Sequence, residues 1–236
     1  MLLSREQLLL DIKRGQARIL LVGPSGQGKS YWSRKFAELD MQYPFRVVGI
    51  DDIIEERLRP ELDALGYTGI GGVSKWMGQP WDERYAAHEA RYIQLETQAV
   101  LGILDEFHSG VPGNIVVDST GSLPLIQDAA HTKGEILRQL YETCFVIYLE
   151  ASPAEAADDL RQYFLDPKPI AFMEHWRPQS NEDPRQTMQR ALPELVAAKA
   201  NVFSGLADVT IRRADLPENA SIHGFVGVAF DKCSGC

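Results

Sequence analysis

The chain has 236 residues, 44% of them hydrophobic, which is an ordinary composition for a globular protein with a substantial core. Its formal net charge is −9, and this acidic balance argues against a large non-specific nucleic-acid interface, so nucleic acid is not an expected partner. No stretch approaches the roughly 20 apolar residues of a membrane span, and we see no leader of the secretory type. We expect a cytoplasmic protein without a membrane partner, and its oligomeric state stays open.

The first strong motif is a glycine-rich turn between a predicted strand and a predicted helix. Residues 18–22 form an apolar run that is typical of a buried strand. Residues 23–30, Gly-Pro-Ser-Gly-Gln-Gly-Lys-Ser, match the pattern G-x-x-x-x-G-K-[ST], and residues 31–39 are predicted to be helical. Strand, glycine turn and helix N-terminus together predict a phosphate-binding loop for ATP.

In such a loop, glycine lets backbone N–H groups converge on phosphate oxygens, and the helix N-terminus adds further donors. Lys29 is expected to bring a positive charge to the β- and γ-phosphates, and the Ser30 hydroxyl is expected to ligate Mg²⁺. The cofactors that we expect are therefore ATP and Mg²⁺. The residues expected to bind ATP here are Gly23, Ser25, Gly26, Gln27, Gly28, Lys29, Ser30 and Tyr31.

Two acids end the second predicted strand, which spans residues 46–52. In open α/β sheets the ligand lies outside the carboxyl ends of the strands, so Asp51 and Asp52 are expected to face a substrate. The alternative is that they cap the next helix, since aspartate is a good N-cap residue. One residue can do both.

A long segment, residues 53–113, separates this strand from the next one. We expect a helix over residues 55–65, a flexible glycine-rich loop over 67–73, and a long helix over 82–107. A crossover between parallel strands needs only about a dozen residues, so the surplus predicts an acceptor-binding insertion.

Three side chains of this insertion have two interpretations each. Trp76 and Trp81, which lie near glycines, are expected either to stack on a ring of the acceptor or to cover the core. His88, on the long helix, is expected to be structural rather than catalytic.

The third predicted strand, residues 114–118, ends in Asp118 and is followed by the polar turn 119–122. An apolar strand with a terminal aspartate is typical of the second half of a phosphate-loop site. We expect Asp118 to bind Mg²⁺, directly or through water, or to accept a proton from the attacking hydroxyl; the alternative is a buried helix cap. Backbone N–H groups of the turn, including that of Gly121, are expected to face the acceptor.

The fourth predicted strand, residues 143–150, precedes a helix that begins at Ser152. Residues 162–186 are rich in proline and in polar side chains, which predicts a lid. Lys168, Arg177 or Arg185 would reach the transferring phosphate when such a lid closes. The alternative for each of them is a solvated surface charge.

A helix over residues 187–206 and a fifth strand over 208–211 complete the pattern. Strands that alternate with helices predict an α/β fold, a P-loop NTPase of three layers (α/β/α) around a five-stranded parallel sheet. We expect one domain over residues 1–221, with the helical acceptor-binding insertion and the lid, and a C-terminal tail over 222–236.

Six segments resemble motifs of the shikimate kinase family, within the nucleoside-monophosphate-kinase-like group. They are the phosphate loop, the acidic motif 51–55, the turn 120–122, the strand motif 148–153, the lid motif 168–170 and the segment 199–208. Glu96 also resembles the glutamate of the family's substrate subdomain. The resemblance covers most of the chain and implies the same fold and phosphoryl transfer from ATP.

The resemblance also implies roles for single residues. It implies that Asp51 and Lys199 contact the substrate and that Lys168 acts from the lid. It further implies that Arg161 and Pro217 enclose the adenine ring.

The acceptor half of the chain departs from the family pattern. Lys168 and Lys199 stand where the family has arginine, and lysine cannot copy the bidentate geometry of a guanidinium group. No arginine stands at the family's spacing before Glu96; Arg84 and Arg91 are only nearby. The match is therefore closer for the ATP half than for the acceptor half.

Our main hypothesis is ATP- and Mg²⁺-dependent phosphoryl transfer to a hydroxyl of a small metabolite. The expected catalytic residues are Lys29, Asp51, Asp118 and Lys168, and the residues expected to bind the acceptor are Asp51, Asp52, Arg84, Gly121 and Lys199. One alternative is a nucleotide or polynucleotide kinase whose phosphate pocket is lined by Arg57, Arg59, Arg84 and Arg91. The other is an ATP-binding switch protein without kinase activity.

Overall fold

The fold is a five-stranded, all-parallel sheet between two layers of helices, which confirms the predicted fold class. The computed structural model describes residues 4–39, 42–125, 134–152, 155, 168–216 and 224–228. The strand order is β2-β3-β1-β4-β5, so the strand before the phosphate loop is central. The strands are β1 (Arg18–Val22), β2 (Phe45–Gly49), β3 (Asn114–Asp118), β4 (Phe145–Glu150) and β5 (Val209–Arg212).

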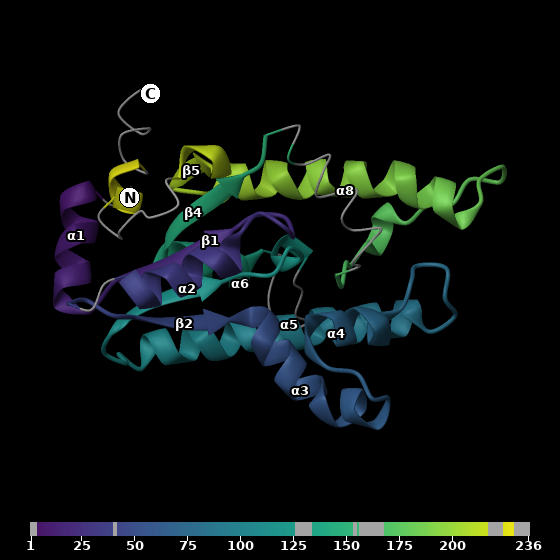
Figure 1. The fold of residues 1–236 in the computed structure, drawn as a ribbon, viewed down its shortest axis with the longest axis horizontal. Coiled ribbons are helices and arrows are strands. Elements are labelled where there is room, and N and C mark those ends of the chain that lie inside the picture. Colours follow the sequence, from purple (N-terminus) through teal and green to yellow (C-terminus); the bar gives the residue numbers. More distant parts are fainter. Residues whose placement is uncertain are drawn as a thin grey trace.

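The helices follow the strands in the alternating order that parallel pairing requires. Figure 1 shows α8 along one side of the sheet, with α3 and α4 on the other side of the molecule. The α-helices are α1 (Arg5–Arg14), α2 (Lys29–Leu39), α3 (Ile50–Ala64), α4 (Gly69–Met77), α5 (Tyr85–His108), α6 (Glu135–Thr143) and α8 (Pro184–Leu206). Short 3-10 turns are η1 (Leu123–Leu125), η2 (Met173–His175) and η3 (Arg213–Asp215).

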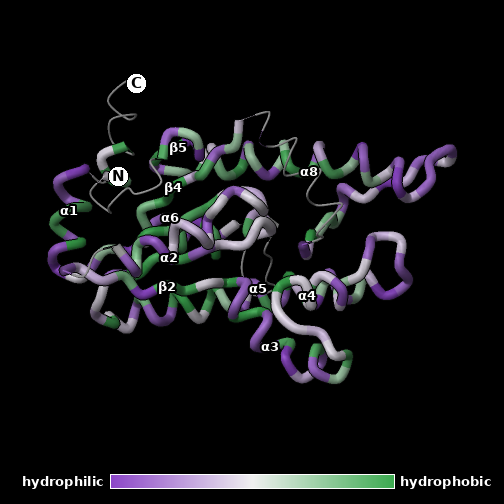
Figure 2. The backbone as a smooth tube through the Cα atoms, viewed as in Figure 1, coloured by the Kyte–Doolittle hydropathy of each residue, from purple (hydrophilic) through white to green (hydrophobic). Residues whose placement is uncertain are grey.

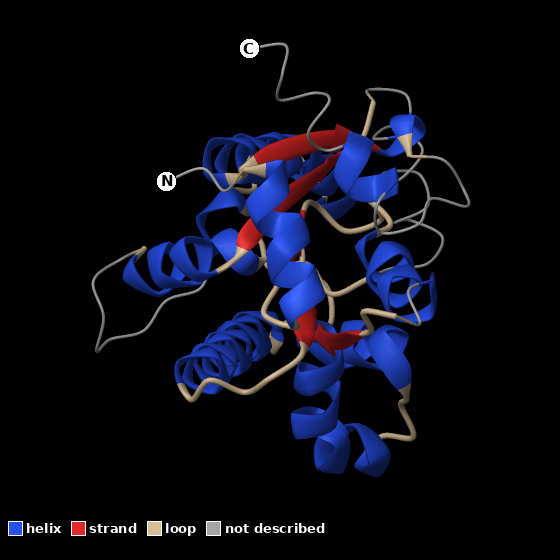
Figure 3. Cartoon of the chain, turned by 90° about the vertical axis from the view of Figure 1, so that its left-hand side faces the viewer, coloured by secondary structure: helices blue, strands red, loops and turns tan. Residues whose placement is uncertain are grey.

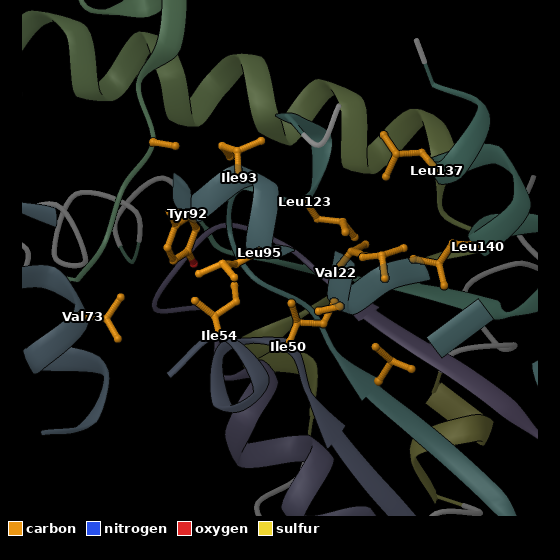
Figure 4. Close-up of a cluster of buried hydrophobic side chains, with 14 of the residues drawn as sticks. Val22, Ile50, Ile54, Val73, Tyr92, Ile93, Leu95, Leu123, Leu137 and Leu140 are labelled. Carbon is orange, nitrogen blue, oxygen red and sulfur yellow. The ribbon is translucent and has the colours of Figure 1, made fainter. Parts of the chain in front are cut away.

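Alternation along the strands divides the core into two clusters. In β1, Leu20 and Val22 face a cluster built with α3, α5, α6 and α8, part of which is drawn in Figure 4. Ile19 and Leu21 face the opposite cluster, built with α1 and α2. Figure 3 shows the strands enclosed by helices, and Figure 2 shows hydrophobic residues concentrated in the strands while the N-terminal end of α8 is hydrophilic.

The second strand ends earlier than the sequence pattern predicts. Strand β2 ends at Gly49, and helix α3 begins at Ile50, so Asp51 and Asp52 lie in the first helical turn and not in the strand. An acidic first turn is stabilised by the positive end of the helix dipole. Side chains on one face of α3, Ile54 and Leu58 among them, are buried and hold the helix against the core. The expectation of an acidic strand end is therefore wrong, although both acids remain at the same edge of the sheet.

The predicted flexible loop over residues 67–73 is also wrong, because helix α4 begins at Gly69. Glycine is unfavourable in a helix by roughly 1 kcal/mol, but three large side chains of this short helix are buried in the core. Val73, Trp76 and Met77 are all less than 5% exposed. Tertiary packing therefore outweighs the local preference of the glycines.

The described part of the C-terminal segment packs on the core. Residues 224–228 are helical, and Phe225 is fully buried. Its ring centroid lies 4.7 Å from that of Phe36 and 5.4 Å from that of Trp32. This segment adds to the helical layer of α1 and α2.

Among the residues that the structure describes, no helix is both long and apolar enough to cross a membrane.

Candidate active site

The phosphate loop lies at the carboxyl end of the central strand, where a parallel sheet leaves a crevice. Two of its positions require glycine. Gly28 has φ +83°, which side chains rarely adopt, and a Cβ on Gly23 would lie 2.8 Å from the carbonyl oxygen of Leu149. The loop can therefore pass close to β4 and still turn into α2, as a backbone cradle for phosphate must.

Lys29, at the start of α2, folds back over the loop. Its Nζ donates hydrogen bonds to the carbonyl oxygens of Gly23, at 2.8 Å, and Pro24, at 3.0 Å. Burial lowers the pKa of Lys29, and the carboxyls of Asp118 and Asp51 counteract this effect. The ammonium therefore lies against the loop and near the two acids, and its contact with the phosphates of ATP stays a prediction.

Asp118 and Ser30 form the pair that was predicted to hold Mg²⁺. Strands β1 and β3 are neighbours, and this pairing brings Asp118 level with Leu21, just before the phosphate loop. The Ser30 hydroxyl donates to Asp118, while burial raises the pKa of that carboxyl. No group of three or more histidine, cysteine or acidic residues suited to a metal ion occurs in the described parts of the chain.

These two oxygen ligands fit Mg²⁺ bound together with ATP. Mg²⁺ in nucleotide sites typically takes one or two carboxylates and completes its shell with water and substrate phosphates. Ser30 and Asp118 supply a hydroxyl and a carboxylate next to the loop that would hold those phosphates. The protein therefore does not need to supply a complete set of ligands for Mg²⁺.

Asp51 and Tyr92 connect α3 to α5 beside this pair. The Tyr92 hydroxyl donates to Oδ1 of Asp51 at 3.0 Å. Burial is the main cause that raises the pKa of Asp51 to about 6, and the charge of Lys29 opposes it. A carboxyl with a pKa near the working pH suits a group that accepts a proton during reaction. Asp52, by contrast, is exposed.

Glu96, on α5, holds the turn after β3. The hydroxyls of Thr120 and Ser122 both donate to its Oε1, the latter at 2.9 Å. Glu96 is fully buried, and its Oε2 has no hydrogen-bond partner among the described residues. Burial raises the pKa of Glu96 to about 8, although the Ser122 hydroxyl and the charge of Lys199 favour the ionised form.

Glu96→Gln should change how stability depends on pH. Between about pH 4.5, the ordinary pKa, and about pH 8, the unfolded chain ionises Glu96 while the folded chain keeps it protonated. The wild type therefore loses free energy of unfolding as the pH rises through this window, and the glutamine variant does not. We expect the variant to gain on the order of 2 kcal/mol relative to wild type from pH 5 to pH 8. Urea unfolding at several pH values measures this, and a pH-independent difference would contradict it.

Gly121 packs the same turn against the phosphate loop. A Cβ at this position would lie 2.7 Å from Oγ and 3.0 Å from the backbone nitrogen of Ser25. The turn packs against Ser25, in the first half of the phosphate loop. Glu96 holds the turn in place by accepting hydrogen bonds from two of its hydroxyls.

Gly121→Ala should weaken MgATP binding about tenfold, because the new methyl group must displace the phosphate loop. Isothermal titration with MgATP measures the dissociation constant. Gly102→Ala is the matched control: Gly102 lies in α5, and a methyl group added there would have nothing within 4 Å, so this substitution should leave the affinity unchanged. Equal effects of the two substitutions would contradict the prediction.

A third group of contacts joins α5 and α8 to residues 170–173, which lie within the predicted lid. The carboxylate of Glu89 accepts the backbone N–H groups of Phe172, at 2.6 Å, and Met173, at 2.9 Å. The Tyr85 hydroxyl donates to the carbonyl oxygen of Ile170 at 2.7 Å. Lys199, from α8, donates to the carbonyl oxygen of Ala171 at 3.3 Å. These contacts hold residues 170–173 against α5 and α8.

Aromatic rings lie next to these contacts of residues 170–173. Trp176 lies against Phe172, with centroids 5.5 Å apart, and against Trp81, with centroids 5.9 Å apart. Trp81 is 46% exposed, whereas Trp76 is buried and stacks on His88 with a centroid distance of 4.3 Å. Trp76 thus covers the core, and His88, whose Nδ1 contacts the carbonyl oxygen of Trp76, has the geometry of a structural residue.

Of the remaining predicted site residues, those that the structure describes make no side-chain hydrogen bond to the groups above, and the others lie outside the described residues. Arg84 is exposed beside the start of α5, and Tyr31 is exposed with an edge contact to Trp32. Lys168 is exposed, and its charge contributes to the lowered pKa of Lys29. Arg161 and Pro217 lie outside the described residues, so their predicted adenine contacts stay predictions.

Sequence reasoning missed two parts of the site. Arg213 donates to the carbonyl oxygen of Gly26, at 2.9 Å, and to Glu155, at 3.0 Å, so it supports the phosphate loop from η3. No sequence pattern indicated this contact. For Glu89 and Tyr92 the sequence did hold a signal. Both residues recur with Glu96 at helical spacing, on the buried face of α5, and buried acids need hydrogen-bond partners.

Comparisons with known proteins show the fold. No known family model matches the chain, and no curated protein matches it. The solved structure of shikimate kinase from Acinetobacter baumannii in complex with shikimate is similar, with a TM-score of 0.55 and 17% sequence identity. The match covers 94% of this chain and 95% of that chain. At this identity the likeness supports a P-loop, kinase-like fold and leaves the acceptor open.

Proposed function

We propose that the protein is an ATP- and Mg²⁺-dependent kinase that phosphorylates a hydroxyl of a small molecule. The observation that carries the proposal is the meeting of Lys29, Asp118 and Asp51 at one edge of the sheet, where the phosphate loop begins. A loop that only binds nucleotide needs the carboxyl of Asp118 for Mg²⁺, but it has no need for the half-buried carboxyl of Asp51 beside it.

Each residue has a role in the proposed reaction. The loop and Lys29 bind the phosphates, and Ser30 with Asp118 would hold Mg²⁺, which neutralises charge on the transferring phosphoryl group. Asp51 accepts the proton of the attacking hydroxyl, and Tyr92 holds its carboxyl in place. Lys168, from the predicted lid, would approach the transferring phosphate. Phosphoryl transfer depends mainly on such positioning, so no covalent intermediate is required.

The proposal is tested by ATP consumption in the presence of Mg²⁺ and pools of hydroxylated metabolites. A kinase should consume ATP slowly alone and at least about tenfold faster with a pool that contains its acceptor. ATP hydrolysis that ignores every pool would support the switch protein instead. The basic phosphate pocket of a polynucleotide kinase has less support, since Arg57 donates to the carbonyl oxygen of Leu95 and Arg84 and Arg91 are exposed.

A further inference from the structure

Arg213 links the phosphate loop to the segment that follows β4. Its Nη1 donates to the carbonyl oxygen of Gly26 at 2.9 Å, and its Nε donates to Oε1 of Glu155 at 3.0 Å. The planar fork of a guanidinium group holds two partners in fixed directions, which the single ammonium of lysine cannot copy. Arg213 therefore fixes the position of the Gly26 carbonyl relative to Glu155.

Glu155 is itself held in place by a capping box. Its Oε2 accepts the backbone N–H of Ser152 at 2.8 Å, while the Ser152 hydroxyl accepts the backbone N–H of Glu155 at 3.3 Å. The N–H of Ser152 is the main cause that lowers the pKa of the Glu155 carboxyl, so this carboxyl is ionised at neutral pH. One carboxylate oxygen binds Ser152 and the other binds Arg213, which anchors the guanidinium group from outside the loop.

The aliphatic part of Arg213 covers one side of the phosphate loop. A Cβ built on Gly28 would lie 3.9 Å from Cδ of Arg213 and 3.8 Å from Cδ1 of Trp32, so both side chains lie on the same side of the loop. Trp32 is buried in the core cluster of α1 and α2. Phosphate must therefore approach the loop from its other side.

The hydrogen bond to Arg213 fixes the direction of one peptide group of the loop. In a planar trans peptide, the carbonyl of one residue and the N–H of the next point in opposite directions. Because the carbonyl oxygen of Gly26 points toward Arg213, the N–H of Gln27 points away from it, toward the side that phosphate must use. A phosphate cradle is built from backbone N–H groups that converge in this way.

We propose that Arg213 is a positioning residue for the nucleotide, because it turns the peptide between Gly26 and Gln27 so that the Gln27 N–H donates to a phosphate of ATP. Glu155 acts through Arg213 by holding the guanidinium group. This inference rests on the proposed binding of ATP at the loop, and both residues lie outside the loop's sequence motif. The observation behind it is the pair of hydrogen bonds that join Arg213 to Gly26 and to Glu155.

Isothermal titration with MgATP measures the first consequence. Arg213→Ala removes the partner that fixes this peptide, and we expect the dissociation constant of MgATP to rise about tenfold. Arg212→Ala is the matched control, because it removes the neighbouring arginine, whose ion pair with Glu150, at 3.5 Å, is largely exposed. It should leave the dissociation constant within about twofold of the wild-type value. Equal effects of the two substitutions overturn the inference.

Arg213→Lys separates the charge from the geometry. Lysine keeps the positive charge but has no planar fork for two partners, so most of the loss in MgATP affinity should remain. Wild-type affinity in this variant would show that the charge alone acts, and it overturns the inference.

Glu155→Gln tests whether Glu155 acts through Arg213. It should weaken MgATP binding when Arg213 is present and have no effect in the Arg213→Ala background, since the two residues belong to one chain of contacts. Additive losses overturn the role of Glu155.

Nuclear magnetic resonance measures the Gln27 N–H directly. In isotope-labelled wild-type protein, the amide proton of Gln27 should move downfield when MgATP is added, because a phosphate oxygen is a strong hydrogen-bond acceptor. At saturating MgATP this shift should be retained in Arg212→Ala and lost in Arg213→Ala. A folded Arg213→Ala protein that keeps the shift overturns the inference. Arg213→Lys gives the same comparison if the alanine variant does not fold.

The two proposals fail differently. Wild-type protein that binds MgATP without a shift of the Gln27 amide overturns the role of Arg213 and leaves the kinase proposal standing. An absence of MgATP binding to the wild-type protein overturns both.

Discussion

Lys29→Ala is expected to lower acceptor-dependent ATP turnover by at least about 100-fold, the cost typical of removing one preorganised group that stabilises transition-state charge. Lys29 is buried between the phosphate loop and two carboxyls, so no other described ammonium replaces it without moving. Turnover is measured with saturating acceptor and a series of MgATP concentrations. MgATP affinity should fall as well, because the same ammonium contacts the ground-state phosphates.

The control for this substitution is Lys13→Ala, which removes an exposed charge from α1. It should keep wild-type turnover, and circular dichroism should show that both variants are folded. Near-normal turnover in folded Lys29→Ala would rule out phosphoryl transfer at this loop and with it the proposed function.

Asp51→Asn is expected to lower kcat by about 100-fold or more, since positioned proton transfer contributes roughly 10² to 10⁴. The pH profile gives the sharper result. Asp51 accepts a proton only when ionised, and its pKa is about 6, so wild-type kcat should rise from pH 5 to pH 7 with a midpoint near 6. The asparagine variant should lack this rise, because its amide does not titrate.

Asp63→Asn is the matched control, since Asp63 is an exposed aspartate of the same helix. It should retain both the wild-type rate and the rise near pH 6. If Asp51→Asn keeps that rise, another group titrates. Asp118 then becomes the candidate proton acceptor, because burial also raises the pKa of its carboxyl.

The strand, glycine turn and helix around the phosphate loop could be predicted from the sequence because their signals are local. A glycine pattern between a strand and a helix specifies where backbone N–H groups and Lys29 lie, and strand pairing then places Asp118 beside them. Predicted and observed bounds agree for β1 and β3 for the same reason: short apolar runs have distinct ends.

The acceptor half could not be predicted as well, because its contacts join residues far apart in the sequence. Glu96 meets Thr120 and Ser122, and Glu89 meets Phe172, across elements whose packing no local pattern specifies. The start of α4 was missed because its glycines indicate a loop, whereas the burial of Trp76 decides the structure. Local preference fails where tertiary packing supplies the larger free energy.

The contact between Trp81 and Trp176 gives the protein an optical label of its own. These are two of only four tryptophans in the chain, and their rings lie close enough for their electronic transitions to couple. Trp81 lies in the predicted acceptor-binding insertion and Trp176 in the predicted lid. Any separation of the two segments during a catalytic cycle would alter near-ultraviolet circular dichroism and indole emission, so the motion can be timed by stopped flow without an attached dye.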